Sequence, residues 1–282
     1  MGVVDMFRPL SLLSARELRG WLLDQHPDDY LLLDVRQKQE YSRGHLPGAI
    51  SMPLWELPER LRELDLNLPL ILYCSFGLRS RAAAVLLHGA GCRDVAILEG
   101  GFAAWQGEVA TGLDSQVLGV LDTSSNERFI AAAWLLEEGT EQFYLRIGAI
   151  CEHMAVAFLF GELAKAEVQH KKTLSGLYEV FSGKQAGEHF ALELLPRTEG
   201  EVFIEGGVPL REVCRWAEGR SARELLDLAI ALETNAYDRY LTLKRRLSDE
   251  NLQRIVEVLA GDERRHLKRL LAAYDEMIES GI

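Results

Sequence analysis

The sequence predicts a protein of two domains, in which a parallel α/β sheet precedes an all-α four-helix bundle. Short apolar segments alternate with helical segments over residues 1–107, which is the pattern of a parallel sheet with helices on both faces. Apolar residues then recur at helical spacing in long segments of the second half. A chain of 282 residues can build a separate core in each half. We therefore expect domains at residues 1–107 and 124–282, joined by a linker at 108–123.

The first half contains helix start signals and apolar strand segments in turn. Ser14-Ala15-Arg16-Glu17 is a capping box, in which the Ser and Glu side chains bond free backbone N–H groups at the start of a helix. Strands separated by helices favour a parallel sheet. Strands are expected at residues 30–34, 70–73 and 94–98, and further helices at residues 79–88 and 101–105.

The composition changes after residue 107. Residues 107–126 are rich in small and polar residues and end in Ser124, Ser125 and Asn126, which are all good N-caps. A long segment with Gly and Pro separates the second long helix from the third. Such a crossover between two helical hairpins is typical of bundles with one long connection. The long helices are expected at residues 127–150, 153–181, 221–247 and 249–279.

Composition and charge limit where the protein works and what it binds. The apolar runs fall far short of the ~20 residues that span a bilayer, and the N-terminus lacks the features of a secretion signal. The net charge of -12 argues against nucleic acid as a partner, because phosphate contacts need a basic surface. The four cysteines contain no C-x-x-C pair, which argues against a disulfide framework or a paired-cysteine metal site. We expect a cytoplasmic protein that binds neither membranes nor nucleic acid.

The first candidate site is Cys74, at the end of the expected strand 70–73. A tight loop follows it and leads directly into a helix, whose N-terminus stabilises a thiolate or a bound anion. Ligands of parallel sheets bind in the crevice beyond the strand ends, and these conditions make a thiol nucleophilic. Arg79 adds a cation at the rim, and Gly77 permits unusual backbone angles. The pattern predicts a reactive cysteine.

Four motifs along the first domain carry a family resemblance. Asp34-Val35-Arg36 with Glu40, the loop at 44–49, Cys-x-x-Gly-x-Arg-Ser at 74–80 and Glu-Gly-Gly-Phe-Ala-Ala-Trp at 99–105 follow in order. In this order they resemble the single-domain rhodaneses, which are sulfurtransferases. The resemblance implies that Cys74, with Arg79 beside it, takes sulfane sulfur from a donor such as thiosulfate and carries it as a persulfide to a thiol or cyanide acceptor. It implies no cofactor in this domain. The loop that binds the outer sulfur would consist of Ser75, Phe76, Gly77, Leu78 and Ser80.

The sequence allows two other interpretations of Cys74. Related phosphatase loops have one residue more between Cys and Arg, so the shorter loop fits a persulfide better than a phosphate. An inert buried cysteine is the other alternative, because free cysteine is often buried. His45 is expected to order its loop, and Asp34 and Arg36 are expected to form an ordering pair.

The second candidate site is a pattern that occurs twice in the second half. A Glu is followed 30 residues later by Glu-x-x-His, and a Tyr lies seven residues after each leading Glu, at Tyr144 and Tyr240. Residues three apart share a helix face, and seven residues make about two turns. Four carboxylates in one core are tolerable only with cations or protons. Two Glu and two Glu-x-x-His units from four helices form a cage for two iron or manganese ions. The six residues are Glu137, Glu167, His170, Glu233, Glu263 and His266.

This doubled pattern resembles the rubrerythrin and bacterioferritin group of ferritin-like di-iron proteins. The resemblance implies that the six residues bind two iron ions, with manganese as the alternative, and that the bundle reacts with peroxide or dioxygen. Tyr144 and Tyr240 are expected to orient the ligands. An external protein would supply electrons, since the chain lacks paired Cys-x-x-Cys motifs, and a homodimer is expected. The extra Glu that rubrerythrins often carry three residues after the third-helix ligand is Ala236 here.

The sequence leaves two functions open. The chain is interpreted as a sulfurtransferase fused to a non-haem di-iron bundle. The alternative is a metal-binding redox protein, with peroxidase or iron-handling activity, whose rhodanese domain is a non-catalytic adaptor. Side chains next to the repeated pattern are expected to be solvated: Glu138, Glu141, Glu162 and Asp262.

Overall fold

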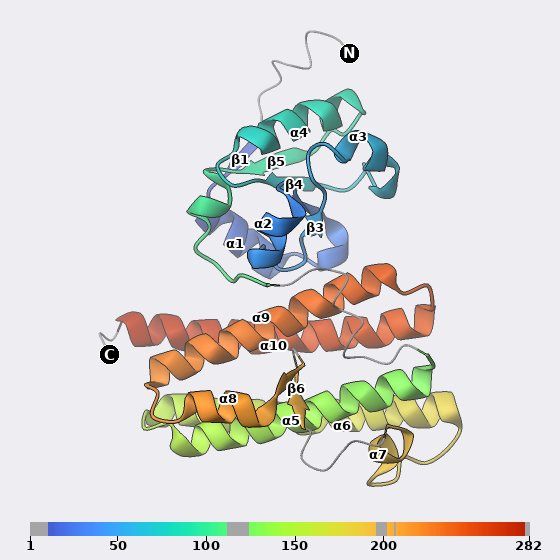
Figure 1. The fold of residues 1–282 in the computed structure, drawn as a ribbon, viewed down its shortest axis with the longest axis vertical. Coiled ribbons are helices and arrows are strands. Elements are labelled where there is room, and N and C mark those ends of the chain that lie inside the picture. The colour runs from blue at the N-terminus through green and yellow to red at the C-terminus, as the bar shows by residue number, and fades with distance from the viewer. Residues whose placement is uncertain (1–10, 112–123, 196–201, 206, 280–282) are drawn as a thin grey trace. The chain divides into compact units, whose positions relative to one another are not determined.

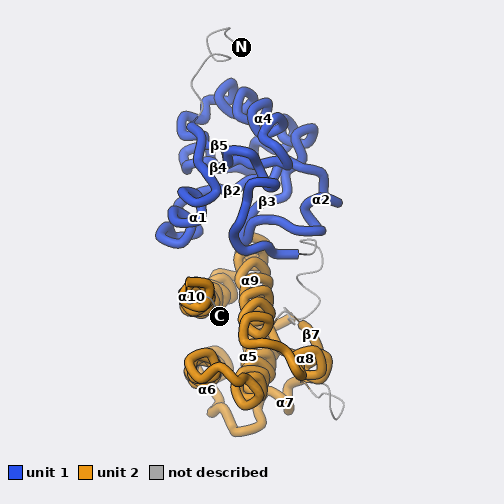
Figure 2. The backbone as a smooth tube through the Cα atoms, turned by 90° about the vertical axis from the view of Figure 1, so that its left-hand side faces the viewer, with its two compact units in different colours: residues 1–113 blue, residues 114–282 orange. Residues whose placement is uncertain are grey.

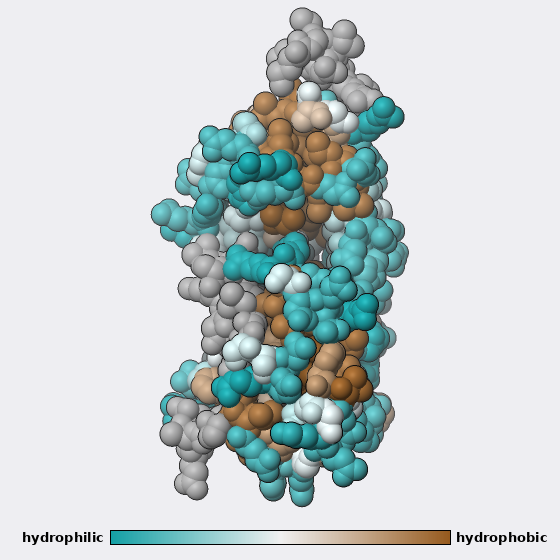
Figure 3. All heavy atoms as spheres, turned by 90° about the vertical axis from the view of Figure 1, so that its right-hand side faces the viewer, coloured by the Kyte–Doolittle hydropathy of each residue, from teal (hydrophilic) through white to brown (hydrophobic). Residues whose placement is uncertain are grey.

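The computed structural model describes residues 11–111, 124–195, 202–205 and 207–279, and its contacts divide the chain into units 1–113 and 114–282 (Figure 2). The expected linker at 108–123 lies outside the described residues from position 112 onward. The predicted fold classes are confirmed: the first unit is a parallel α/β sheet, and the second is a helical bundle (Figure 1). Among the described helices, none combines the length and apolar character needed to cross a bilayer. On the face drawn in Figure 3, hydrophilic side chains interrupt the apolar patches.

The sheet of the first unit has five parallel strands in the order β1-β5-β4-β2-β3. The central strand β4 is fully buried, and the three predicted strands correspond to β2, β4 and β5. The edge strands β1 and β3 were not predicted, because three and two residues are too few to show a period. The strands are β1 (Ser11–Leu13), β2 (Leu31–Asp34), β3 (Ile50–Ser51), β4 (Leu70–Tyr73) and β5 (Val95–Leu98).

Helices cover both faces of this sheet, and alternate strand residues enter two separate cores. Leu33 and Leu72 pack in the core beside α3 and α4, whereas Leu32 and Ile71 pack in the core beside α1 and α2. The capping box at Ser14 is present. The helical segments are α1 (Ala15–Asp24), η2 (Pro27–Asp29), α2 (Lys38–Arg43), α3 (Leu57–Arg60), η3 (Leu61–Glu63), α4 (Leu78–Gly89) and η4 (Gly101–Ala104).

The second unit is built from two long helical hairpins, α5 with α6 and α9 with α10 (Figure 1). All four long helices begin and end within a few residues of the predicted positions. Ser125 caps α5, and the predicted capping box at Ser221 starts α9. The helices are α5 (Asn126–Ile150), α6 (Met154–Ser182), α9 (Ala222–Arg246) and α10 (Glu250–Glu279).

Two apolar clusters fill the bundle, one toward each end. On α5, residues up to Leu136 belong to one cluster and residues from Phe143 belong to the other. The other three long helices divide in the same way. The layer between the clusters contains the buried charged residues of the repeated pattern.

The crossover between the hairpins carries structure that was not predicted. It contains α7 (Phe190–Leu194), a short antiparallel pair β6 (Phe203–Ile204) and β7 (Val208–Pro209), and α8 (Leu210–Ala217). The β6 strand lies against α5. Ile204 is buried in one apolar cluster and Phe203 packs against the other, so the crossover reaches the middle of the bundle.

Candidate functional sites

Cys74 stands at the carboxyl end of the central strand β4, directly before α4, and its side chain is buried. The Gly77 N–H donates a hydrogen bond to Cys74 Sγ over 3.1 Å, and Ser80 Oγ lies 3.6 Å from the same sulfur. Gly77 has a left-handed φ of 98°, which lets the loop turn back toward the sulfur before the helix begins. The predicted loop therefore directs its donors at the thiol.

The environment of Cys74 favours its thiolate. Burial by itself raises the pKa of the thiol. Hydrogen bonds from the Ser80 side chain and from backbone N–H groups of Ser80, Phe76 and Gly77 outweigh it, so the pKa of Cys74 lies below its ordinary value. Burial raises the pKa of Cys92, which is an ordinary buried thiol. The surroundings of the two cysteines thus act on their thiolates in opposite directions.

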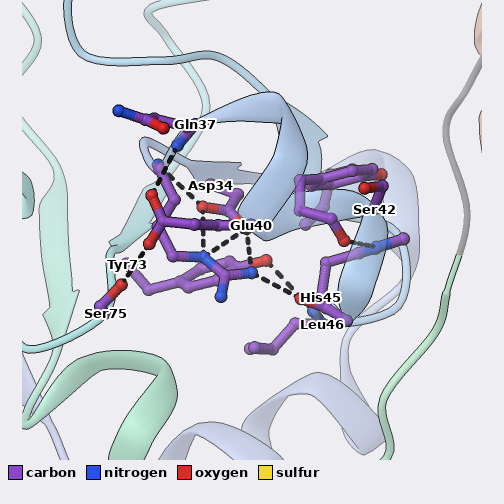
Figure 4. Close-up of polar contacts among 12 residues, drawn as sticks. Asp34, Gln37, Glu40, Ser42, His45, Leu46, Tyr73 and Ser75 are labelled. Carbon is purple, nitrogen blue, oxygen red and sulfur yellow. Dashed lines mark hydrogen bonds and ion pairs between the residues drawn. The ribbon is translucent and has the colours of Figure 1, made fainter.

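Arg79 is held at the rim of the loop by Glu40 of α2. Its two terminal nitrogens donate to the two carboxylate oxygens of Glu40 over 2.7 and 2.9 Å. Ser75 Oγ donates to Glu40 over 2.7 Å, and Figure 4 shows Ser75 and Glu40 facing each other. Hydrogen bonds from Arg79 are the largest cause that lowers the pKa of Glu40 to about 2. The pair ties the loop to α2.

The segment after β5 holds the loop from another direction. Phe102 N–H donates to the Cys74 carbonyl over 2.7 Å, and Ala103 N–H donates to the Ser75 carbonyl over 3.1 Å. Gly101 has a φ of 65°, and a Cβ at this position would lie 2.2 Å from the Cys74 carbonyl oxygen. Only glycine fits this close approach. The Gly-Gly-Phe motif therefore positions the cysteine.

The rest of the loop is exposed. Phe76 and Leu78 are 76% and 80% exposed, so their side chains form an apolar rim beside the buried thiol. Their backbone belongs to the turn that surrounds the sulfur.

Asp34, Arg36 and His45 order the neighbouring chain. Arg36 binds the Asp34 carboxylate over 2.6 to 3.0 Å and donates to the Gly44 carbonyl over 2.6 Å. The His45 ring stacks on Tyr41 with centroids 3.6 Å apart, and its Nδ1 lies 2.9 Å from the Tyr41 carbonyl oxygen. Asp34 and His45 are shown in Figure 4. These contacts agree with the ordering roles that the sequence suggested.

In the second unit, the structure brings together all six residues of the repeated pattern. α5 and α9 each contribute one Glu, and α6 and α10 each contribute a Glu-x-x-His pair. The two imidazole rings stack with centroids 5.1 Å apart. The six side chains are buried: Glu137, Glu167, His170, Glu233, Glu263 and His266.

The donor atoms of these residues lie close to one another. His170 Nδ1 is 2.9 Å from Glu167 Oε2 and 3.2 Å from Glu137 Oε2. His266 Nδ1 is 3.3 Å from Glu167 Oε1 and 3.5 Å from Glu233 Oε2. Groups of three such atoms lie within 4.8 Å of one another, which is a spacing that can hold a metal ion.

The two tyrosines donate to carboxylates, but they do so differently. Tyr144 on α5 donates to Glu233 on α9, so it reaches across the bundle rather than along its own helix. Tyr240 on α9 donates to Glu205 over 2.6 Å. Burial and the nearby carboxylates raise the pKa of both tyrosines well above the ordinary value, so each remains a donor.

The expectation that Asp262 is solvated was wrong. Asp262 is 5% exposed, and its Oδ2 lies 3.3 Å from His170 Nε2. A carboxylate on the outer nitrogen of a histidine fixes the ring and leaves the other nitrogen free to bind a metal. Asp262 lies next to Glu263 on α10 and faces α6. The residue pattern of α10 alone does not show which helix its side chain faces. Glu138 and Glu141 are partly exposed and pair with Lys171.

Glu205 is a member of the cluster that the sequence did not indicate. It follows β6 in the crossover and is 3% exposed. One of its oxygens lies within 4.8 Å of oxygens of both Glu137 and Glu167. The one available signal was Gly139, an unexplained glycine in the middle of α5, where β6 approaches.

The cluster has the chemistry of a metal site. Burial, followed by the neighbouring carboxylates, raises the pKa values of Glu167, Glu205 and Glu263 well above the ordinary value. Several of the buried carboxylate oxygens form no hydrogen bond with any described residue, which is costly without a cation. A set of carboxylate oxygens and imidazole nitrogens fits iron or manganese. These oxygens are Glu137 Oε1, Glu167 Oε1, Glu205 Oε2, Glu233 Oε2 and both oxygens of Glu263.

Both units match known families. Residues 14–108 match the rhodanese-like domain family, and residues 224–281 match the rubrerythrin family. The first unit is 31% identical over 100 residues to a thiosulfate sulfurtransferase of Pseudoalteromonas translucida, a match that covers 36% of this chain and 90% of that protein.

Further relatives match the same region. The uncharacterized protein YqhL of Bacillus subtilis is 40% identical over 78 residues, covering 28% of this chain and 62% of that protein, which is less than two thirds of its length. A solved rhodanese-like domain protein from Staphylococcus aureus is 28% identical, with a TM-score of 0.33 and coverage of 36% of this chain and 98% of that chain.

Proposed function

We propose that this protein transfers sulfur at Cys74 and binds metal in its helical bundle. The chain belongs to the rhodanese-like family through its first unit, and its second unit contains a rubrerythrin domain. The observation that carries the first part is the Cys74 loop. A thiol with a lowered pKa stands at a helix N-terminus, encircled by backbone N–H groups. This is the arrangement that a persulfide anion requires.

The chemistry proposed at Cys74 has two steps. The thiolate attacks the outer sulfur of thiosulfate, a sulfur–sulfur bond to Cys74 forms, and the bond to the sulfite leaving group breaks. The acceptor, cyanide or a thiolate, then attacks the outer sulfur of the persulfide and regenerates the Cys74 thiolate. The N–H of Gly77 and the Ser80 hydroxyl stabilise the negative charge on sulfur in the free thiolate and in the persulfide.

The assay is transfer from thiosulfate to cyanide with the full chain, together with a mass measurement of the protein after thiosulfate alone. We expect wild type to gain the mass of one sulfur atom and to form thiocyanate. Cys74→Ser should lose both signals, whereas Cys92→Ser, the matched buried cysteine, should keep both. Equal turnover in Cys74→Ser would contradict the proposal and favour the adaptor function for this unit.

In the bundle, the proposed ligands of two iron ions, with manganese as the alternative, are Glu137, Glu167, His170, Glu233, Glu263 and His266. When bound, such ions supply redox chemistry with peroxide or dioxygen. The protein orients their ligands: Tyr144 donates to Glu233, and Asp262 fixes the ring of His170. The apolar clusters on both sides of the layer exclude water from it. We further propose an external electron donor and a homodimer.

Metal analysis tests this second part. Protein reconstituted with Fe²⁺ under anaerobic conditions should retain close to two equivalents after gel filtration. Glu167→Gln keeps the shape of the side chain but removes the charge of a carboxylate that lies close to both His170 and His266. We expect this variant to lose most of the metal. Wild-type protein that retains no metal would contradict the proposal, whatever the sulfurtransferase assay shows.

A further inference from the structure

Glu205 enters the bundle from outside the four long helices. It is carried by the turn between β6 and β7, yet it is more buried than His170. Its Oε1 accepts the hydrogen bond of Tyr240, and no N–H or O–H donor in the described part of the chain reaches Oε2. One of its oxygens lies within 4.8 Å of oxygens of Glu137 and Glu167. An exposed loop residue would have none of these properties.

Two features of α5 admit the hairpin that carries Glu205. A Cβ at Gly139 would lie 2.0 Å from the Phe203 carbonyl oxygen, so β6 approaches the helix as closely as only glycine allows. The Glu205 N–H donates to Thr140 Oγ1 over 3.0 Å, and that hydroxyl donates in turn to the Leu136 carbonyl over 3.1 Å. The backbone of Glu205 is therefore fixed on α5, and its buried side chain lies beside Glu137 and Glu167.

The hairpin breaks the symmetry of the repeated pattern. The positions on α9 that correspond to Gly139 and Thr140, counted from the leading Glu, are Asn235 and Ala236. They offer neither the space of glycine nor a hydroxyl. The tyrosines show the same difference, because Tyr144 donates to the leading Glu of the opposite repeat, Glu233, whereas Tyr240 donates to Glu205. Among the described residues, one half of the cluster thus contains a carboxylate that the other half lacks.

We propose that Glu205 is a seventh ligand of the metal cage and that it makes the two ion positions unequal. The inference rests on the proposed metal site. Glu205 would add a carboxylate to the ion held beside Glu137 and Glu167, while the ion beside Glu233, Glu263 and His266 would have none from the described part of the crossover. A fifth carboxylate also favours the more highly charged oxidised ions over the reduced ones, because its negative charge offsets their greater positive charge inside a buried site.

Titration of the metal-free full chain with Co²⁺ tests the assignment, because the visible absorption of Co²⁺ changes with its ligands. Wild type should bind two equivalents with distinguishable spectra. In Glu205→Gln, which keeps the size of the side chain, the affinity of one equivalent should fall at least tenfold and its spectrum should change. The other equivalent should be unaffected. Glu212→Gln alters an exposed glutamate in α8 nearby and should match wild type.

A second variant tests Glu205 by displacing the backbone that carries it. Gly139→Ala displaces β6 without touching a ligand, so it should weaken the same equivalent as Glu205→Gln, with helix content checked by circular dichroism. If wild type binds two ions and Glu205→Gln binds both with unchanged affinity and spectra, Glu205 is not a ligand, although the metal site stands. If wild type binds no Co²⁺, both the inference and the proposed metal site fail.

Discussion

The two sites differ in how they balance charge. At Cys74, the charged groups nearby find partners inside the protein: Arg79 binds Glu40, and backbone N–H groups face the sulfur. In the bundle, by contrast, buried carboxylates lie next to one another, and several of their oxygens form no hydrogen bond with the described residues. The first site is therefore complete once the chain has folded, whereas the second requires cations or protons to be stable.

The two sites also differ in how they are assembled. The donors around Cys74 come mainly from a single turn, residues 74–80, and a helix N-terminus aligns them. The bundle site needs side chains from four long helices and from the crossover, so its geometry depends on tertiary packing. Disturbing each site therefore has different consequences for stability and for reactivity.

Metal binding should change the stability of the bundle more than any of the substitutions below changes the stability of the first unit. A divalent ion that binds only the folded state stabilises it by about 4 kcal/mol when its concentration is 1,000 times its dissociation constant. Addition of Fe²⁺ or Mn²⁺ to metal-free protein should slow hydrogen exchange in peptides from α5, α6, α9 and α10. Peptides from the β4–α4 region serve as the internal control and should exchange at the same rate. Equal protection of both regions, or of neither, would remove the contrast between the sites.

Gly101→Ala should show that the Cys74 site depends on backbone packing. The new Cβ would overlap the Cys74 carbonyl, and the left-handed conformation disfavours alanine, so we expect a loss of about 3 kcal/mol in the free energy of unfolding. Sulfur transfer should fall with it. Gly20→Ala is the matched control, because no atom lies within 4 Å of its Cβ and alanine favours the helix. Similar stability of the two variants in urea titrations would contradict the close approach of Gly101 to the Cys74 carbonyl.

Much of both sites was predictable from the sequence, for physical reasons. Cys74 and its loop are contiguous, and the Glu-x-x-His pairs repeat at helical spacing, so a one-dimensional pattern contains them. Asp262 and Glu205 were misjudged or missed because their burial depends on which other element faces them. A crossover loop carries no period, so nothing local shows that Glu205 enters the core. Gly139 was the one sequence feature related to this contact, and it can be interpreted only once the position of β6 beside α5 is known.

The thiolate at Cys74 is expected to depend on Ser80. Removing the hydroxyl in Ser80→Ala removes one hydrogen bond to sulfur, worth about 1 kcal/mol, so the pKa of Cys74 should rise and alkylation at neutral pH should slow about fivefold. The measurement is the rate of iodoacetamide modification against pH, followed on the Cys74 peptide. The Cys92 peptide is the internal reference, since burial raises the pKa of that thiol. An unchanged profile for Cys74 would mean that the backbone donors alone stabilise the thiolate.

The smallest expected effect concerns the pair between Glu40 and Arg79, which is partly exposed and contributes about 1 kcal/mol or less. The pKa of Glu40 is lowered to about 2 in the folded protein, below the ~4.3 of an unfolded chain. Its contribution is therefore present above pH ~4.3 and is lost as the pH falls toward 2. Wild type should exceed Glu40→Gln in stability at pH 6, and the difference should shrink as the pH falls from ~4.3 toward 2 in urea titrations. Glu59→Gln, an exposed glutamate of α3, should show no such convergence. A difference that stays constant with pH would mean that Glu40 acts through its shape and not through its charge.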